Sequence, residues 1–369
     1  MESTRPDRGR QVLVTGGTGL IGRTAVDAFL AAGWHVVGMS RGASAHADGG
    51  YVGVPVDLRD ERAVAGALHD LPGITHLAYT SVYEKPGLVA GWSDPEQMAT
   101  NRSMLDNVLR PLAAAGHLEQ VTIMQGTKAY GAHLHPIPLP ARERHPRDPH
   151  ENFYWHQEDL LREVAGRAGF RWTILRPVQV VGPAYGVGYC TPPVIGALAA
   201  VCHRTGQPFG FPGLPLSVPK QVVDVRLVAN ALVWAATGEA AHGEHFNLTN
   251  GEVFSWPELW PVLAEELGVP AAAPVARRLA DFLPAHAEAW AEVAAAHHLR
   301  QPDLAAVLGQ SHFYADYTFG SGLTEAPPPA LVSTVKVKQA GFTEVRDTEL
   351  TFRHAIRELQ RRRILPRLS

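Results

Sequence analysis

The amino-acid sequence predicts an α/β protein with a doubly wound parallel sheet, followed by a smaller and mainly helical C-terminal part. From Gln11 to about Leu175, apolar strand-like runs alternate with helical patterns, which is typical of βαβ units with helices on both faces of a sheet. A glycine-rich segment directly follows the first strand. After Arg176 and Pro177 the alternation stops, and amphipathic helical patterns follow. Together these observations indicate a sheet of the Rossmann type.

The alternating half of the chain contains six strand-like runs, which suffice for a complete dinucleotide-binding sheet. We expect strands at 11–15, 34–39, 51–56, 74–79, 120–125 and 172–176. We expect helices at about 20–32, 60–70, 94–115 and 153–168. Later in the chain, helices are expected at about 224–237, 256–268, 286–299 and 346–363, with a short strand near 244–249.

We place the boundary between the two parts near residue 176. Residues 1–176 are expected to form the dinucleotide-binding core, and 177–369 mostly a substrate-binding cap, from which some segments return to the core. Ligands of such sheets bind beyond the carboxyl ends of the strands. We therefore expect the substrate, a small molecule, between the two parts.

Charge and composition exclude several classes of function. The formal net charge of -3 leaves no basic field for nucleic acid. No apolar run is long enough to span a membrane and the segment 1–10 is polar, so we expect a soluble cytoplasmic protein. Two cysteines cannot form a disulfide framework, and the histidines of 133–156 lack metal-ligand spacing. We therefore predict no metal site.

The glycine-rich segment is the first functional signal. Gly16, Gly19 and Gly22 satisfy GxxGxxG, and Gly17 provides the overlapping GxGxxG. Glycines allow a tight turn and close approach of the backbone to a pyrophosphate at a helix N-terminus. Because a strand precedes this segment and a helix follows it, we predict that a dinucleotide binds here. Its contacts are expected from Gly16, Thr18, Gly19, Leu20 and Ile21.

The end of the second strand favours NADPH over NADH. Folds that prefer NAD place an acidic residue there, which binds the ribose 2′-hydroxyl. This chain has Ser40 and Arg41 instead, with no acid before Asp48. A hydroxyl and a guanidinium suit a 2′-phosphate, although a solvated surface arginine is the alternative for Arg41.

Further cofactor contacts are expected at the carboxyl ends of other strands. Asp57 and Leu58 close the third strand, where they could bind and cover the adenine, and Thr80 and Ser81 end the fourth strand beside the glycine turn. Both pairs could equally be capping residues. The remaining residues that we assign to the cofactor site are Gln125, Tyr154, Pro177 and Val180.

The usual catalytic pair of short-chain dehydrogenases is incomplete. Such enzymes carry a tyrosine and, one helical turn later, a lysine that lowers the pKa of the phenol. Here Tyr154 is followed four residues later by Glu158, whose charge would raise that pKa. Lys128, in a loop just past the fifth strand, is a substitute cation that could reach the same ring; an ordinary loop lysine is the alternative.

At this point the sequence resembles the progesterone 5β-reductase/iridoid synthase-like family, which are atypical short-chain dehydrogenases. The similar segments are TGGTGLIG at 15–22, SRG at 40–42, VDL at 56–58, GTKAYG at 126–131, NFYWHQED at 152–159, ILRPVQVVGPA at 174–184 and FNLTNGEVFSWPELWPVLAEELG at 246–268. The resemblance implies an NADPH-dependent 1,4-reduction of the activated C=C bond of an α,β-unsaturated carbonyl compound. It also implies that Tyr154 and Lys128 stabilise the developing enolate.

The sequence departs from the family in two places, and it leaves other functions open. Trp155 stands where the family has a second tyrosine, and the segment 132–150 is shortened to a loop rich in histidine and proline. Steroid or monoterpene specificity therefore does not carry over. The alternatives are a 1,2-carbonyl reductase, a nucleotide-sugar epimerase or dehydratase, and a nonenzymatic protein that senses the NADP redox state. The apolar stripe of 94–115 is compatible with a homodimer, but also with packing on the sheet of a monomer.

Overall fold

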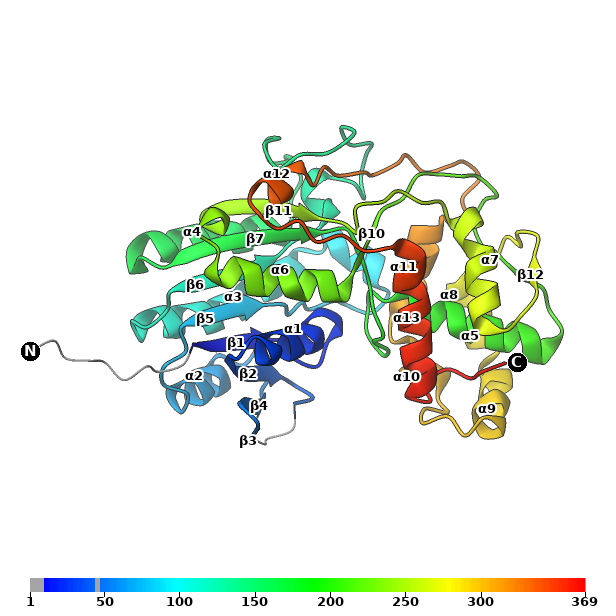
Figure 1. Cartoon of the computed structure of the whole chain (residues 1–369), viewed down its shortest axis with the longest axis horizontal. Coiled ribbons are helices and arrows are strands. Elements are labelled where there is room, and N and C mark those ends of the chain that lie inside the picture. The colour runs from blue at the N-terminus through cyan, green and yellow to red at the C-terminus, as the bar shows by residue number, and fades with distance from the viewer. Residues whose placement is uncertain (1–9, 44–46, 369) are drawn as a thin grey trace, which may run out of the picture.

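The computed structural model describes residues 10–43 and 47–368, so most of the polar N-terminal segment lies outside the described residues. Figure 1 shows a sheet with helices on both faces and, beside it, a cluster of helices from the second half of the chain. The α/β fold predicted from the sequence is thereby confirmed.

The sheet has eight strands in the order β11-β7-β6-β5-β1-β2-β4-β3 in the described part of the chain. All neighbouring strands are parallel except β3, which pairs with β4 in the antiparallel direction. The strand order reverses between β1 and β5, and ligands of doubly wound sheets bind at such a reversal. The strands are β1 (Gln11–Thr15), β2 (His35–Ser40), β3 (Ala47–Asp48), β4 (Tyr51–Pro55), β5 (His76–Tyr79), β6 (Gln120–Met124), β7 (Arg171–Pro177) and β11 (Glu244–Leu248). Every strand predicted for the sheet forms, with its ends within two residues of the expected positions.

Helices cover both faces of the sheet because its strands are apolar on both sides. In β1, Val12 and Val14 pack against α1 (Leu20–Ala31) and α6 (Val225–Thr237). Leu13, which points to the opposite face, packs against a separate core. That core includes α2 (Glu61–His69), α3 (Pro95–Ala114) and α4 (Phe153–Ala168). The apolar stripe of α3 is buried in this core, against the sheet and α4.

The later part of the chain is built around α5 (Thr191–Thr205). The sequence patterns did not predict this helix, because it is apolar all round and has no polar face to mark its period. Around it lie α7 (Trp256–Leu267), α8 (Leu279–Ala285), α9 (Ala287–Ala296), α10 (Leu304–Leu308), α11 (Ser311–Phe319) and α13 (Thr348–Arg361). Several segments from beyond residue 176 join the sheet half: β11 pairs with β7, α6 packs on α1, and Val337 and Phe342 pack in the same core as β11.

The remaining elements are short. They are the 3-10 helices η1 (Leu88–Ser93), η2 (Thr127–Tyr130) and η3 (Glu239–Ala241), the strands β8 (Gln179–Val181), β9 (Phe209–Gly210), β10 (Val222–Asp224) and β12 (Ala271–Ala272), and α12 (Val335–Gln339). Among the described residues, none of the helices has the length and apolar character needed to cross a membrane.

Candidate active site

The glycine-rich turn joins β1 to α1. Gly16 adopts a left-handed backbone with φ of 69°, which favours glycine, and its N–H donates to the carbonyl of Met39 at 2.8 Å. The N–H of Gly19 donates to the carbonyl of Gly16 at 2.8 Å. Helix α1 begins at Leu20 without a side-chain cap. Its first N–H groups are therefore available to an anion.

Side chains have little or no room at the glycine positions of this turn. A Cβ at Gly22 would overlap the carbonyl oxygen of Gly16, and one at Gly17 would lie 3.2 Å from the Cα of Gly38. The turn is thus a cradle that a side chain would fill, and it fits the pyrophosphate of a dinucleotide. The hydroxyl of Thr80 donates to the carbonyl of Thr15 at 2.6 Å, so Thr80 closes the end of β5 against this turn. This contact fits the capping role that we kept open for Thr80, and its assignment to the cofactor stays a prediction.

The end of β2 lies beside the same turn. The hydroxyl of Thr18 donates to that of Ser40 at 3.1 Å, and Arg41 is exposed. Asp57 was expected to bind adenine, but both of its carboxylate oxygens accept from Arg59, at 3.0 Å from Nε and 2.5 Å from the terminal nitrogen. Arg59 lowers the pKa of Asp57 to about 2.

Two of the residues assigned to the adenine side therefore have other partners. Besides the ion pair, Asp57 accepts from the backbone N–H of Arg59 at 3.0 Å, which is a capping contact. Leu58 is 4% exposed and belongs to the core under α2 and α3. Sequence reasoning missed Arg59, a second guanidinium whose charge, like that of Arg41, acts on Asp57. Its position two residues after Asp57 was the available signal.

Tyr154 lies in the first turn of α4, which Asn152 caps by accepting from the backbone N–H of Tyr154 at 3.0 Å. The phenol oxygen reaches the carboxyl ends of β6 and β7. A Cβ placed on Gly126 would be 3.3 Å from that oxygen and 3.6 Å from the carbonyl of Pro177. Within 10–43 and 47–368, no residue forms a hydrogen bond with the Tyr154 hydroxyl.

The phenol is protonated at neutral pH. Burial and the charge of Glu84 raise the pKa of Tyr154 above its usual value, against the opposing effect of Arg176. The hydroxyl is therefore a hydrogen-bond donor at the edge of the sheet, and no described residue of the protein accepts its proton.

Lys128 comes from η2 and approaches the same place. Its Nζ lies 5.9 Å from the ring centroid of Tyr154 and 4.3 Å from that of Trp92, and it donates to the hydroxyl of Tyr189 at 3.5 Å. Burial lowers the pKa of Lys128 to about 8, and the charge of Glu84 limits that fall. Tyr154 and Lys128 are thus neighbours in space, although the sequence separates them into different elements.

Aromatic residues that the sequence analysis did not single out surround this pair. The rings of Trp92 and Tyr317 are in edge-to-face contact at 5.0 Å, and those of Tyr189 and Tyr314 at 5.1 Å. Tyr314 and Tyr317 belong to α11, so the late helices contribute a wall of the site. No local pattern in the sequence marks these residues, because three distant segments supply them.

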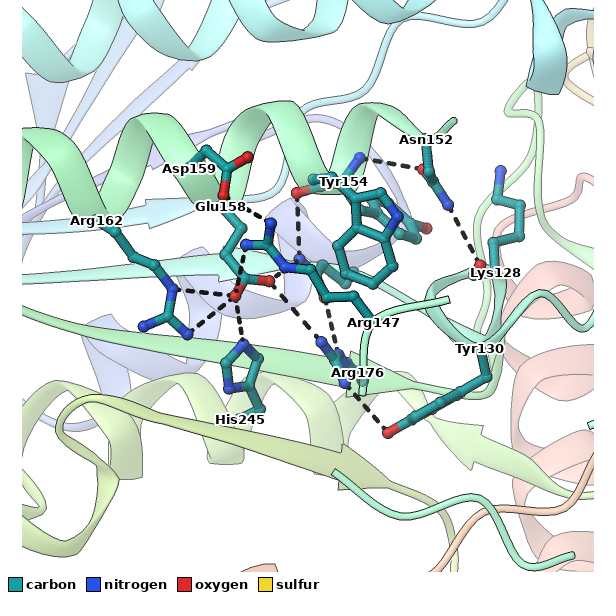
Figure 2. A network of polar contacts seen from close by, with 12 residues as sticks. Lys128, Tyr130, Arg147, Asn152, Tyr154, Glu158, Asp159, Arg162, Arg176 and His245 are labelled. Carbon is teal, nitrogen blue, oxygen red and sulfur yellow. Dashed lines mark hydrogen bonds and ion pairs between the residues drawn. The ribbon is translucent and has the colours of Figure 1, made fainter. Parts of the chain in front are cut away.

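Glu158 occupies the position of the usual lysine, but its carboxylate is engaged elsewhere (Figure 2). One oxygen accepts from Arg162 at 2.9 Å and lies 3.0 Å from Arg147. Burial alone would raise the pKa of Glu158, but His245, Arg147 and Gln125 outweigh it and hold that pKa below its usual value. The expectation that Glu158 raises the pKa of the phenol is wrong: burial and Glu84 do so.

Gln125 directly follows β6, and its side chain takes part in this network of charges. Its Nε2 donates to Glu158 at 3.1 Å, and its Oε1 accepts from Arg176 at 2.8 Å. The side chain assigned to the cofactor is therefore occupied by protein partners. Of the other two assigned residues, Pro177 is buried at the end of β7 and Val180 is half-buried in β8.

The shortened loop 132–150 is held to α4. Trp155, the departure from the family pattern, donates from Nε1 to the carbonyl of His150 at 3.1 Å. Asp148 lies 2.6 Å from the ring of His150 and 2.9 Å from that of His135. The amide of Asn152 donates to His150 at 3.0 Å and to the carbonyl of Lys128 at 3.3 Å. The histidines thus link the loop to the backbone beside Lys128. In the described part of the chain, no group of three or more candidate ligands could hold a metal ion.

Comparison with known proteins shows the family and the fold of the chain. Residues 12–249 match the model of the NAD dependent epimerase/dehydratase family. The structure is similar to UDP-glucose 4-epimerase of Thermotoga maritima with a TM-score of 0.68 and 17% identity, covering 95% of this chain and 99% of that one. It is also similar to the UDP-glucose 4-epimerase of Thermus thermophilus, with a TM-score of 0.66, 20% identity and the same coverage of both chains. At these identities the likeness concerns the fold.

Sequence relatives give a narrower assignment. The chain is 30% identical to 3-oxo-Δ(4,5)-steroid 5-beta-reductase of Arabidopsis thaliana, over 70% of this chain and 69% of that protein. It is 28% identical to (S)-8-oxocitronellyl enol synthase of Antirrhinum majus, over 85% of this chain and 80% of that protein. The chain is therefore an oxidoreductase that belongs to the NAD dependent epimerase/dehydratase family and, within it, to the progesterone 5β-reductase/iridoid synthase-like enzymes.

Proposed function

We propose that this protein is an NADPH-dependent reductase that adds hydride to the β-carbon of an α,β-unsaturated carbonyl compound. When bound, NADPH supplies the hydride. The side chains of the protein then have to stabilise the negative charge that grows on the carbonyl oxygen. The observation that carries the proposal is the protonated and uncommitted hydroxyl of Tyr154 beside the ammonium of Lys128.

A neutral phenol suits a reduction that ends in an enolate. Hydride addition to the β-carbon moves electrons to the carbonyl oxygen, where a preorganised donor is worth about 3–4 kcal/mol in the transition state. The hydroxyl of Tyr154 is such a donor, because burial and Glu84 keep it protonated. Lys128 adds positive charge in a site lined by Trp92 and Phe153, where little solvent screens it. The α-carbon of the enolate can take its proton from water afterwards, so a complete proton relay is not needed.

The cofactor assignment rests on the cradle and on the two guanidiniums beside it. The first amides of α1 would hold the pyrophosphate, and Arg41 with Ser40 would hold the 2′-phosphate. Arg59 adds positive charge to the same side, although Asp57 neutralises part of it. We find no carboxylate among the described side chains of the β2 end to bind a 2′-hydroxyl in its place.

The same phenol could also protonate an alkoxide, so 1,2-reduction of an aldehyde or ketone is the second candidate. Epimerases and dehydratases need a base that removes a proton, and a tyrosine with a raised pKa is poorly suited to that step. The site therefore favours reduction over epimerisation.

The test is a screen of NADPH oxidation with purified protein. The substrates are 2-cyclohexenone-type enones, enals, saturated ketones and sugar nucleotides, each with NADPH and with NADH. We expect turnover with enones or enals. Turnover confined to saturated aldehydes and ketones would replace the proposed reaction by 1,2-reduction, and tight cofactor binding without any turnover would favour a sensor of the NADP redox state.

A further inference from the structure

We infer that Glu84 is the counter-ion of Lys128, coupled to it through the hydroxyl of Tyr189, and that it keeps the Lys128 ammonium protonated in the reductase. This inference rests on the proposed function for its meaning in catalysis, but the coupling itself is independent of the substrate. It assigns a positioning role to Glu84, a residue that the sequence analysis did not single out.

The contacts form a chain of three side chains. Nζ of Lys128 donates to the hydroxyl oxygen of Tyr189 at 3.5 Å, and that hydroxyl donates its own proton to the carboxylate of Glu84. Nε1 of Trp92 donates to the same Tyr189 oxygen at 2.9 Å. The hydroxyl therefore has its oxygen toward the cation and its hydrogen toward the anion, which is the orientation that stabilises both charges.

Glu84 is held in this position by buried amides of α3. Nε2 of Gln97 donates to the other carboxylate oxygen of Glu84 at 2.6 Å, and Oε1 of Gln97 accepts from the backbone N–H of Lys85 at 2.7 Å. Asn101, one turn later, accepts from the N–H of Tyr83 at 2.8 Å and donates to its carbonyl at 2.9 Å. Both amides are fully buried. The loop after β5 is thus fixed to α3 on both sides of Glu84.

The other groups that face Lys128 do not supply a negative charge. Tyr154 reaches it from α4 and Tyr189 from the loop before α5, and burial raises the pKa of both phenols. His133 approaches from the loop after η2, and burial together with the charge of Lys128 lowers its pKa to about 4, so it is neutral. Among the described residues, Glu84 is the carboxylate whose charge acts on Lys128.

The consequence concerns the pH range of the reaction. Rings of Trp92, Phe153, Tyr154 and Tyr189 surround the ammonium, and such surroundings favour the neutral amine. An amine without its proton could not stabilise an enolate. Glu84 opposes the loss of the Lys128 proton through the hydroxyl of Tyr189, which lies between the two charged groups.

The chain allows a direct measurement, because it contains five lysines: Lys85, Lys128, Lys220, Lys336 and Lys338. The apoprotein is labelled with ¹³C at the lysine Cε and titrated by NMR, and the spectrum of Lys128→Arg identifies the resonance of Lys128. The test variant is Glu84→Gln, which keeps the shape of the side chain and removes its charge. The matched control is Glu96→Gln, which removes an exposed carboxylate 2.5 Å from Nζ of Lys85.

In Glu84→Gln we expect the acid dissociation constant of Lys128 to rise roughly tenfold or more, since an opposite charge close to a group commonly shifts its pKa by one to three. Glu96→Gln should lower the pKa of Lys85 and leave that of Lys128 unchanged. If Glu84→Gln does not fold, Tyr189→Phe is the second variant; it removes the bridging hydroxyl and should also lower the pKa of Lys128, by less. An unchanged titration of Lys128 in the folded variant would overturn the inference.

An activity measurement separates this inference from the proposed function. The alkaline limb of kcat/KM for enone reduction should move to lower pH in Glu84→Gln, by the same amount as the NMR titration. If the pKa of Lys128 falls in Glu84→Gln but the wild-type protein reduces no enone, the assignment of Glu84 as counter-ion is supported and the proposed function is wrong. If enones are reduced but Lys128 titrates identically in both proteins, the proposed function stands and the counter-ion is wrong.

Discussion

Glu158 follows Tyr154 by one turn of α4, yet the two side chains serve different surroundings: arginines enclose the Glu158 carboxylate, whereas the Tyr154 hydroxyl lies at the edge of the sheet beside Gly126 (Figure 2). In ordinary short-chain dehydrogenases a cation occupies the position of Glu158. Here Lys128, the cation that we propose in its place, comes from η2, and the carboxylate of Glu158 pairs with arginines instead.

The hydroxyl of Tyr154 should matter more for the reaction than for cofactor binding. We predict that Tyr154→Phe lowers kcat/KM for an enone by about 10²-fold or more, the usual effect of losing one donor to an oxyanion. The dissociation constant of NADPH, measured by fluorescence titration, should stay within about twofold of the wild-type value, since Tyr154 is one of many residues assigned to the cofactor and its hydroxyl is assigned to the oxyanion. The matched control is Tyr130→Phe, because the Tyr130 hydroxyl donates to Asn247 at 2.8 Å and accepts from Arg176 at 3.3 Å, so it is occupied by protein partners. Equal losses in both variants would contradict the assignment.

Arg41 should select between the two nicotinamide cofactors. A charge-assisted hydrogen bond contributes about 1.5–3 kcal/mol, so Arg41→Ala should weaken NADPH binding by roughly 10- to 150-fold. NADH lacks the 2′-phosphate and serves as the internal control, with an expected change of less than about threefold. Calorimetric titration of NADPH and of NADH into the wild-type and Arg41→Ala proteins measures the four dissociation constants. A parallel loss for NADH would show that Arg41 does not read the 2′-phosphate.

Gly22 should be indispensable to the cradle. In Gly22→Ala the new methyl group would overlap the Gly16 carbonyl, so the turn has to shift. We predict a loss of about 1–3 kcal/mol in the free energy of unfolding and at least about tenfold weaker NADPH binding. Gly66→Ala is the matched control, because Gly66 lies in α2 with open space around it. That variant should be more stable by about 0.5–1 kcal/mol and bind NADPH normally.

Glu158 should stabilise the fold rather than take part in the chemistry. Removing one partner of a buried ion pair costs about 3–5 kcal/mol of unfolding free energy. Because Arg147 and Arg162 are partly exposed, we predict a loss at the lower end of this range for Glu158→Gln. The control on the same helix is Glu163→Gln, whose partners are exposed and whose loss should cost less than about 1 kcal/mol. Urea unfolding at neutral pH compares the two variants.

The Glu158 effect has a defined pH dependence. Since the folded protein lowers the pKa of Glu158 below 4.5, its stabilisation is complete above the unfolded value and is lost as the pH falls through the folded one. The difference in unfolding free energy between wild type and Glu158→Gln should therefore be constant at neutral pH and shrink below about pH 4.5. A difference that grows on acidification would contradict this sign.

The strands of the sheet were predictable because each is an apolar run between turn residues, and burial on both faces requires such runs. Helix α5 could not be predicted in this way, because twelve of its residues are buried and no polar face reveals a helical period. The cradle followed from local sequence, since a strand, three glycines and a helix are consecutive.

The proposed catalytic pair was assigned through a family motif, whereas its surroundings depend on tertiary contacts. Glu84 and Tyr189 meet although 105 positions separate them in the chain, and neither belongs to a recognisable motif. Asp57 shows the opposite case: the sequence placed it correctly at the end of a strand but could not reveal that Arg59 would bind both of its oxygens.

The position to which hydride is transferred tests the central claim most directly. The protein is incubated with 2-cyclohexenone and NADPH that carries deuterium at the transferable position of C4, and the product is examined by NMR and mass spectrometry. We predict cyclohexanone with deuterium at the former β-carbon, and a much lower yield with Tyr154→Phe. An allylic alcohol with deuterium on the carbinol carbon would contradict the claim and establish 1,2-reduction instead.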